Sequence, residues 1–142
     1  MKNIIFIEGV SGVGKSTMVK KLGETLKNTG YSVECYYEGD IDNPLDLCWV
    51  AYLGLDEFNE MLKMFSFCEK EIKDNIVFQG SYVLVQYKKT NEFIFTEEVT
   101  KFMKTHEFCF RPSNPVSIKQ FTKVFEDRWE EFANRGFSKS IS

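Results

Sequence analysis

Eight residues near the start of the chain have the types and the spacing to bind a polyphosphate. Residues 9–16 read GVSGVGKS, which matches the pattern G-x-x-x-x-G-K-[ST]. A polyphosphate carries several negative charges and must be wrapped closely by backbone N–H groups, which side chains at the glycine positions would obstruct. Lys15 would reach the β and γ phosphates, and the Ser16 hydroxyl would ligate Mg²⁺. The residues that we expect to bind the triphosphate are Gly9, Ser11, Gly12, Val13, Gly14, Lys15, Ser16 and Thr17.

The residues on either side of this segment supply the elements that such a loop needs. Residues 3–8 are short, apolar and rich in β-branched side chains, which predicts a strand. Residues 15–28 place Met18, Val19, Leu22 and Leu26 on one face of a helix. The alternative is a glycine turn that merely joins a strand to a helix and leaves the lysine exposed.

With this motif the chain resembles the P-loop NTPases, and within them the nucleoside and nucleotide kinase branch. The resemblance implies an α/β fold with a parallel sheet, helices on both faces and the loop at the carboxyl ends of the strands. It also implies a bound nucleoside triphosphate with Mg²⁺, and we expect ATP because no Asn-Lys-x-Asp motif for guanine is present. The order Glu38-Gly39-Asp40, Pro44 and Asp46 is similar to that of small bacterial P-loop proteins of unsettled activity.

In kinases of this branch an acidic residue at the end of the second strand accepts the proton of the acceptor hydroxyl or orients a magnesium-bound water. Glu38 and Asp40 stand at that place, and the resemblance therefore assigns them catalytic roles, with Asp40 also a metal ligand. Strand alternation would point both side chains the same way. The alternative is that the acids decorate a turn and that Asp42 or Asn43 caps a helix.

The chain departs from this branch at its predicted third strand. The sequence there ends in Gln79-Gly80-Ser81 instead of an acid followed by an arginine. Arg111, next to Pro112, is our candidate for stabilising the charge of the transferred phosphoryl group. Arg128 is a second candidate, with a solvated helix face as the alternative.

Periodicity and capping signals predict the remaining elements. We expect strands at 3–8, 32–37 and 76–79 to adjoin in parallel with the first strand central, and a strand interrupted at Gly80 to continue to residue 87. The expected helices cover 15–28, a segment beginning near Pro44 that includes Cys48, Trp49 and Tyr52, a segment from Asp56 that includes Ile72, one after Thr96, and 118–135. The last is opened by a capping box at residues 117–120 and stopped by Gly136. Three strands make an incomplete sheet, whose uncovered edge would favour a homo-oligomer or a partner protein.

Composition limits the class of protein. The 142 residues predict a single domain (1–142) with a frayed tail at 137–142, and 43% hydrophobic residues suffice for a core. A net charge of −3 excludes a general attraction to nucleic acid, and no apolar run reaches the length of a membrane span. Four scattered cysteines and a single histidine make zinc ligation a poor interpretation. We therefore expect a soluble, cytoplasmic protein with reduced thiols.

Two functions from different classes fit these observations. The first is an ATP-dependent kinase that transfers the γ-phosphoryl group to a nucleoside-like, nucleotide-like or other small acceptor. The second is a nucleotide-binding module or slow ATPase without acceptor chemistry, as part of a larger assembly. The segment after Asp40 favours the first, because it could hold an acceptor. The short chain and the altered third-strand end favour the second.

Overall fold

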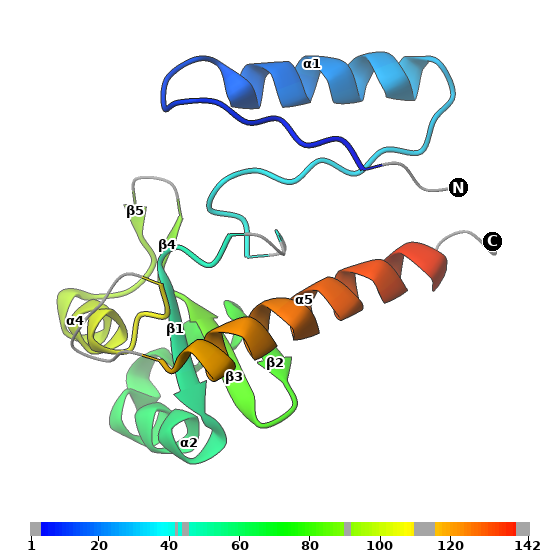
Figure 1. Cartoon of the computed structure of the whole chain (residues 1–142). Coiled ribbons are helices and arrows are strands. Elements are labelled where there is room, and N and C mark those ends of the chain that lie inside the picture. Colours follow the sequence, from blue (N-terminus) through cyan, green and yellow to red (C-terminus); the bar gives the residue numbers. More distant parts are fainter. Residues whose placement is uncertain (1–3, 42, 44–45, 90–91, 110–115, 139–142) are drawn as a thin grey trace. The chain divides into compact units, whose positions relative to one another are not determined.

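The computed structural model describes residues 4–41, 43, 46–89, 92–109 and 116–138, with side chains of the last helix as far as residue 134 (Figure 1). The protein is a mixed α/β chain. Its contacts divide it into two units, Met1–Tyr37 and Glu38–Ser142, and each is described by itself.

The first unit is built around α1 (Lys15–Asn28), which confirms the predicted helix. The Thr29 N–H caps its end by donating to the Leu26 carbonyl at 3.2 Å. A Cβ atom on the buried Gly23 would lie 2.5 Å from the Cys35 sulfur, so a glycine is needed where α1 packs against the segment that follows it.

The strands predicted at 3–8 and 32–37 are not found in the described part of this unit. Residues 4–8 and 31–37 carry no strand assignment, and the expected parallel pairing between them is not seen. Ile4, Ile5 and Phe6 are each more than half exposed. Apolar burial, which stabilises most strand pairing, is therefore not available to these residues here.

The second unit contains a three-stranded sheet with the order β1 (Val50–Gly54), β3 (Tyr82–Gln86), β2 (Ile76–Gln79). Both pairings are antiparallel, with Ala51 opposite Val85 and Val77 opposite Leu84. The strand predicted at 76–79 is present as β2, but its partner is β3 and not a parallel neighbour. The reason is Gly80, whose φ of 62° lets the chain turn back into a hairpin.

The helix predicted from Pro44 through Tyr52 is wrong in the described residues, since residues 46–49 carry no helix and the chain forms β1 from Val50. Val50 and Tyr52 belong to the core on one face of the sheet, whereas Ala51 and Leu53 belong to the core on the other. A strand buried on both faces is apolar at every position, so periodicity does not separate it from a buried helix.

The other elements of this unit are α2 (Leu55–Met64), a 3₁₀ turn (Ser66–Cys68), α3 (Glu69–Lys73), the hairpin of β4 (Lys88–Lys89) and β5 (Glu92–Phe93), α4 (Glu97–Thr105) and α5 (Ile118–Ser138). Of these, α2, α4 and α5 begin close to where they were predicted. The helix predicted from Asp56 was expected to include Ile72 but ends earlier, and the 3₁₀ turn, α3 and the hairpin after β3 were not predicted.

The capping box that opens α5 is formed, since the Gln120 N–H donates to the Ser117 hydroxyl at 3.2 Å and the Ser117 N–H to the Gln120 side chain at 3.0 Å. The helix runs past Gly136, the predicted stop, to Ser138.

Helices cover both faces of the sheet (Figure 1). On one face α2, α3 and α4 enclose a core that includes Leu53, Met61, Ile72, Val85 and Met103. On the other, α5 places Val124 against Val50 and Leu84. No helix in the described ranges is long and apolar enough to cross a bilayer.

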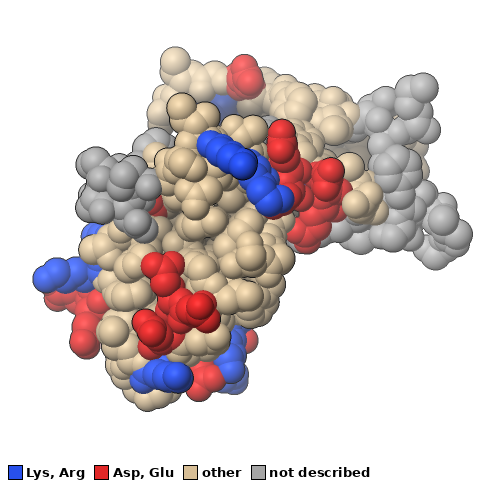
Figure 2. Space-filling view, turned by 60° about the horizontal axis from the view of Figure 1, so that its bottom comes forward, with Lys and Arg blue, Asp and Glu red and all other residues tan. Residues whose placement is uncertain are grey.

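Charged side chains lie in small separate groups on the face shown in Figure 2. Blue and red atoms are interspersed among uncharged residues, and no basic stripe crosses that face. A long nucleic acid would find no continuous track of cations there.

Candidate functional site

The backbone of the phosphate loop (residues 9–17) has the conformation that its glycines permit. Gly12 and Gly14 have φ values of 83° and 88°, in the left-handed region that other residues rarely adopt. Gly14 is also the N-cap of α1, and its carbonyl accepts the Met18 N–H at 3.0 Å. The first N–H groups of a helix have no intrahelical acceptor, so the start of α1 presents donors and a partial positive charge to an anion.

The loop closes on itself between its ends. A Cβ atom at Gly9 would lie 3.0 Å from the Val13 side chain, which explains the glycine at the first position. The Lys15 ammonium donates to the Gly9 carbonyl at 2.9 Å and to the Val10 carbonyl at 3.0 Å. The positive charge is thereby held across the mouth of the loop, where a phosphate would replace the two carbonyls as its partner.

The other predicted loop residues lie where they are accessible. Ser11, Val13, Ser16 and Thr17 are exposed, and Ser16 and Thr17 belong to the first turn of α1. Donor N–H groups, one ammonium and a hydroxyl are a set that fits a triphosphate with a hydroxyl-ligated Mg²⁺. The roles of these residues remain a prediction, and the geometry is compatible with them.

Glu38 and Asp40 open the second unit and lie on either side of Gly39, and both are exposed. They form the acidic loop (residues 38–41). Gly39 has a φ of 85°, so the backbone turns there and the alternation expected of a strand does not apply. The Gly39 N–H donates to an Asp46 carboxylate oxygen at 2.6 Å, and the buried Gln86 amide donates to the Gly39 carbonyl.

Asp46 links the acidic loop to the start of β1. Its other carboxylate oxygen accepts the Cys48 N–H at 2.9 Å. Burial, followed by the neighbouring Asp46 carboxylate, raises the pKa of the Cys48 thiol to about 12. This thiol is therefore protonated at neutral pH and is a poor nucleophile.

Arg128 has a different role from either predicted one. Its side chain is 5% exposed, and its guanidinium donates to the Ile41 carbonyl and, at 3.1 Å, to the Asn43 carbonyl. It is neither a free phosphate-binding cation nor part of a solvated face. Arg128 stands four residues after the buried Val124, and this spacing on the inner face of α5 was the signal that sequence reasoning missed.

The third-strand end is occupied by structural contacts. The Gln79 amide donates to a Glu131 carboxylate oxygen at 3.0 Å, and its carbonyl oxygen lies 3.0 Å from the Tyr82 hydroxyl. An Asp127 oxygen also lies 3.0 Å from that hydroxyl. Burial, followed by Asp127, raises the pKa of Tyr82. Gln79 thus ties β2 to α5 rather than replacing a metal ligand.

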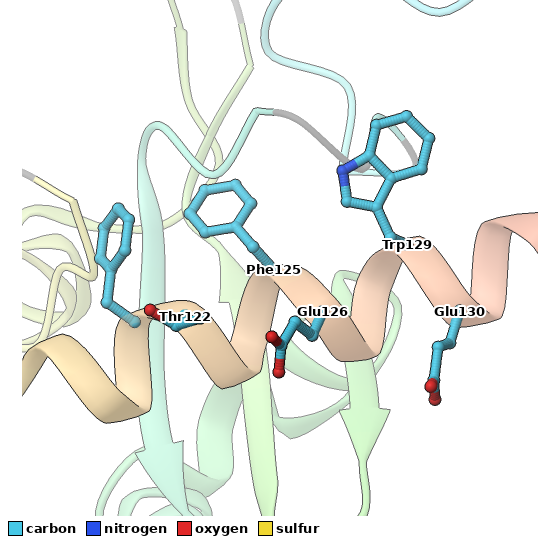
Figure 3. Close-up of a pocket in the computed structure, with 6 residues that line it drawn as sticks. Thr122, Phe125, Glu126, Trp129 and Glu130 are labelled. Carbon is cyan, nitrogen blue, oxygen red and sulfur yellow. The ribbon is translucent and has the colours of Figure 1, made fainter.

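A shallow pocket on α5 offers no second phosphate site (Figure 3). Phe125 and Trp129 project from one side of the helix and the carboxylates of Glu126 and Glu130 from the opposite side. The remaining lining residues, Phe121 and Thr122, add no cation. A polyphosphate would meet only negative charge there.

The structure therefore brings together the residues of the phosphate loop in one unit and fixes the acidic loop in the other. The predicted role of Arg111 falls outside the described residues. No family model, curated protein or solved structure matches this chain.

Proposed function

We propose that the phosphate loop binds the triphosphate of MgATP and that the chain transfers the γ-phosphoryl group to a small acceptor. The observation that carries the proposal is the loop itself. Two left-handed glycines open a helix of 14 residues, and the Lys15 ammonium lies across the loop within 3.0 Å of two of its carbonyls. This arrangement presents the first N–H groups of α1 and an ammonium to a ligand.

The energetics require these parts to act together. Micromolar affinity for a nucleotide needs about 8 kcal/mol. A helix N-terminus contributes only about 0.3 to 2 kcal/mol, whereas charge-assisted hydrogen bonds contribute roughly 1.5 to 3 kcal/mol each. Several N–H groups and Lys15 must therefore bind the phosphates at the same time.

The acidic loop supplies the second half of the proposal. Asp40 or Glu38 would accept the proton of the acceptor hydroxyl, and Asp40 with Ser16 would hold Mg²⁺. Arg128, Gln86 and Asp46 contact the backbone of this segment, and Glu38 and Asp40 are both exposed. A fixed carboxylate is what phosphoryl transfer needs, because positioning and charge supply most of its catalysis.

A parallel pairing of residues 3–8 with 32–37 is a further part of the proposal. In P-loop proteins the phosphate loop follows one such strand and leads into a helix. The apolar residues of the first segment support the pairing, since Ile4, Ile5 and Phe6 are more than half exposed and would lose exposed surface on pairing. Amide hydrogen exchange with and without MgATP would detect the pairing as protection of these segments.

Calorimetry tests the binding step. MgATP should bind the wild-type protein, and Lys15→Ala should reduce the affinity at least tenfold, since one charge-assisted contact of about 1.5 to 3 kcal/mol is removed. Lys20→Ala, on an exposed position of the same helix, is the matched control and should leave the affinity unchanged. Equal MgATP affinity for the wild type and Lys15→Ala would refute the proposal.

An acceptor screen tests the transfer step. ADP release from MgATP is measured against nucleosides, nucleoside monophosphates, sugars and aminoglycosides. With an active acceptor, Asp40→Asn should lower turnover by roughly 10² to 10⁴ with little change in ATP affinity. Glu38→Gln is the comparison for the neighbouring acid. Turnover that survives both substitutions would remove the catalytic role.

The second candidate function is a nucleotide-binding module without acceptor chemistry. Gln79 favours it, because the residue that stands in place of an acidic third-strand end is buried and bonded to Glu131. MgATP binding without acceptor-dependent ADP release would support this candidate over the kinase.

A further inference from the structure

Two lysines and two aromatic rings gather at one end of the second unit, in what we name the lysine–aromatic patch (Trp49, Lys88, Phe93 and Lys104). The Lys88 ammonium lies 4.3 Å from the centre of the Trp49 ring and 5.2 Å from that of Phe93. The Lys104 ammonium, from the last turn of α4, lies 4.5 Å from the Phe93 ring centre. Phe93 is 48% exposed, so the patch is open to solvent.

Backbone contacts fix the patch. Lys88 and Phe93 are directly opposite in the β4–β5 hairpin. The Tyr87 N–H donates to the Trp49 carbonyl and the Ile94 N–H to the Tyr87 carbonyl, both at 3.0 Å. Trp49 has a φ of 57°, a left-handed conformation that is rare for a bulky residue. The position of its ring is therefore set by the tertiary structure and not by local preference.

Among the described residues, aromatic rings and no carboxylates lie beside the two ammonium groups of the patch. In the described ranges no acidic oxygen lies within 4.0 Å of the Lys88 or Lys104 ammonium. Glu92 is opposite Lys89, and strand alternation puts this pair on the other face of the hairpin. Thr90 and Asn91, which complete the hairpin sequence, carry no charge. The Lys88 and Lys104 ammonium groups lie 5.2 and 4.5 Å from the centre of the same Phe93 ring. Their like charges repel each other, and a bound anion would reduce this repulsion.

We propose that the lysine–aromatic patch binds a phosphate monoester attached to an apolar ring. The two ammonium groups hold the phosphate, and the rings of Trp49 and Phe93 contact the attached group. Gln86 is the last residue of β3 and donates to the Gly39 carbonyl, and Lys88 follows it by two residues. The acidic loop and the patch therefore lie at the same end of β3. The inference rests on the proposed function in one respect only, which is that the bound monoester is the phosphoryl acceptor.

This chemistry selects among acceptor classes. Cationic aminoglycosides are repelled by two lysines, and neutral sugars gain nothing from them. A long nucleic acid is less well suited than a small ligand, because the chain has a net charge of −3 and two cations make a short site.

A fluorescence titration tests the patch directly. Trp49 and Trp129 are the two tryptophans, so Trp129→Phe makes Trp49 the sole reporter. Lys15→Ala in the same full-length chain removes the phosphate loop as a competing anion site. Phenyl phosphate is titrated at low salt, with phenol as the neutral probe. Saturable quenching by phenyl phosphate and a far weaker effect of phenol are expected.

Lysine variants in this background decide the outcome. Lys88→Gln and Lys104→Gln keep most of the side-chain volume and should each raise the Kd roughly five- to tenfold. Lys89→Gln, on the other face of the hairpin, should leave the Kd unchanged. Failure of phenyl phosphate to bind, or equal effects of all three substitutions, would overturn the proposal. So would binding of a twelve-residue oligothymidylate more than tenfold tighter than that of phenyl phosphate.

The outcome is separable from that of the proposed function. The titration contains no triphosphate, so a failure of MgATP to bind the phosphate loop does not change it. Loss of monoester binding, in turn, leaves the MgATP calorimetry intact. Monoester binding without acceptor-dependent ADP release would keep the patch as a binding site and remove the kinase.

Discussion

Single residues set the conformation of the phosphate loop. Gly12 and Gly14 are needed because their φ values are left-handed, which strains any residue with a side chain. Crowding is not the reason, because an added Cβ would meet nothing within 4 Å at either position. Gly9 is needed for the opposite reason, because a Cβ there would press on Val13. The three glycines of the motif therefore have two different structural reasons, a left-handed backbone at Gly12 and Gly14 and a close contact at Gly9.

Replacing Gly14 should weaken binding through backbone strain alone. Gly14→Ala forces a side chain into the left-handed region at a cost of about 1 to 2 kcal/mol. If the loop relaxes to avoid this cost, MgATP affinity measured by calorimetry should fall about five- to thirtyfold. Gly30→Ala is the matched control, with a φ of 91° and open space around it at the other end of α1. An equal loss of affinity in both variants would contradict a role for the loop conformation.

Two thiols should make stability depend on alkaline pH. Burial is the largest cause that raises the pKa of Cys48 to about 12 and that of Cys109 to about 11, from an ordinary value of 9.0. A raised pKa in the folded state means that the native protein binds these protons more tightly than the unfolded chain. Their contribution to stability is complete below about pH 9 and is lost as the pH rises through 11 and 12.

Urea unfolding between pH 8 and 11 measures this dependence. The free energy of unfolding should fall with rising pH, and the fall should be shallower in the double variant Cys48→Ala/Cys109→Ala. Identical slopes for the variant and the wild type would show that other groups are responsible.

At the scale of elements, α5 connects the sheet to the acidic loop. Val124 packs into the core, Arg128 reaches the carbonyls of the loop and Glu131 binds Gln79 at the end of β2. These positions are spaced by three or four residues and so lie on one face of the helix. A single helix face thus combines apolar packing with polar positioning.

Removing the arginine should loosen the acidic loop. Arg128→Met preserves length and apolar contact but leaves the Ile41 and Asn43 carbonyls without this donor. Hydrogen bonds to charged groups are worth about 1.5 to 3 kcal/mol each and two are removed, so the free energy of unfolding in urea should fall by about 3 to 6 kcal/mol. Amide hydrogen exchange at Gly39 and Ile41 should also accelerate.

The control for this prediction lies on the same helix. Lys123 pairs with Asp127 at 2.9 Å, and its side chain is 63% exposed. Exposed pairs of this kind contribute about 0.3 to 0.5 kcal/mol, so Lys123→Met should change stability little. Equal losses for the two variants would show that α5 responds to any change of charge and not to the loss of the loop contact.

At the scale of the whole molecule, the two units differ in how much they bury. Every residue of the two hydrophobic cores belongs to the second unit. In the described part of α1, Gly23 is the only buried residue. A unit of this size with so little buried surface does not reach stability alone.

A fragment comparison tests this difference. Residues 38–142 should unfold in a single cooperative thermal transition followed by circular dichroism, because both cores are retained. Residues 1–37 alone should show no such transition. Loss of cooperativity in the longer fragment would mean that the first unit is needed to complete the core of the second.

The sequence by itself determined the features that depend on neighbouring residues. The helix at 15–28, the capping box at Ser117 and the start of α4 after Thr96 were predicted correctly, because capping and helical periodicity act within a few residues. The phosphate-binding role of residues 9–17 stays a prediction. Tertiary structure decided β1, the antiparallel partner of β2 and the burial of Arg128. These features depend on contacts between distant segments. A short apolar run has the same local pattern in a buried strand as in a buried helix, and a lone arginine has the same local pattern whether it is buried or exposed.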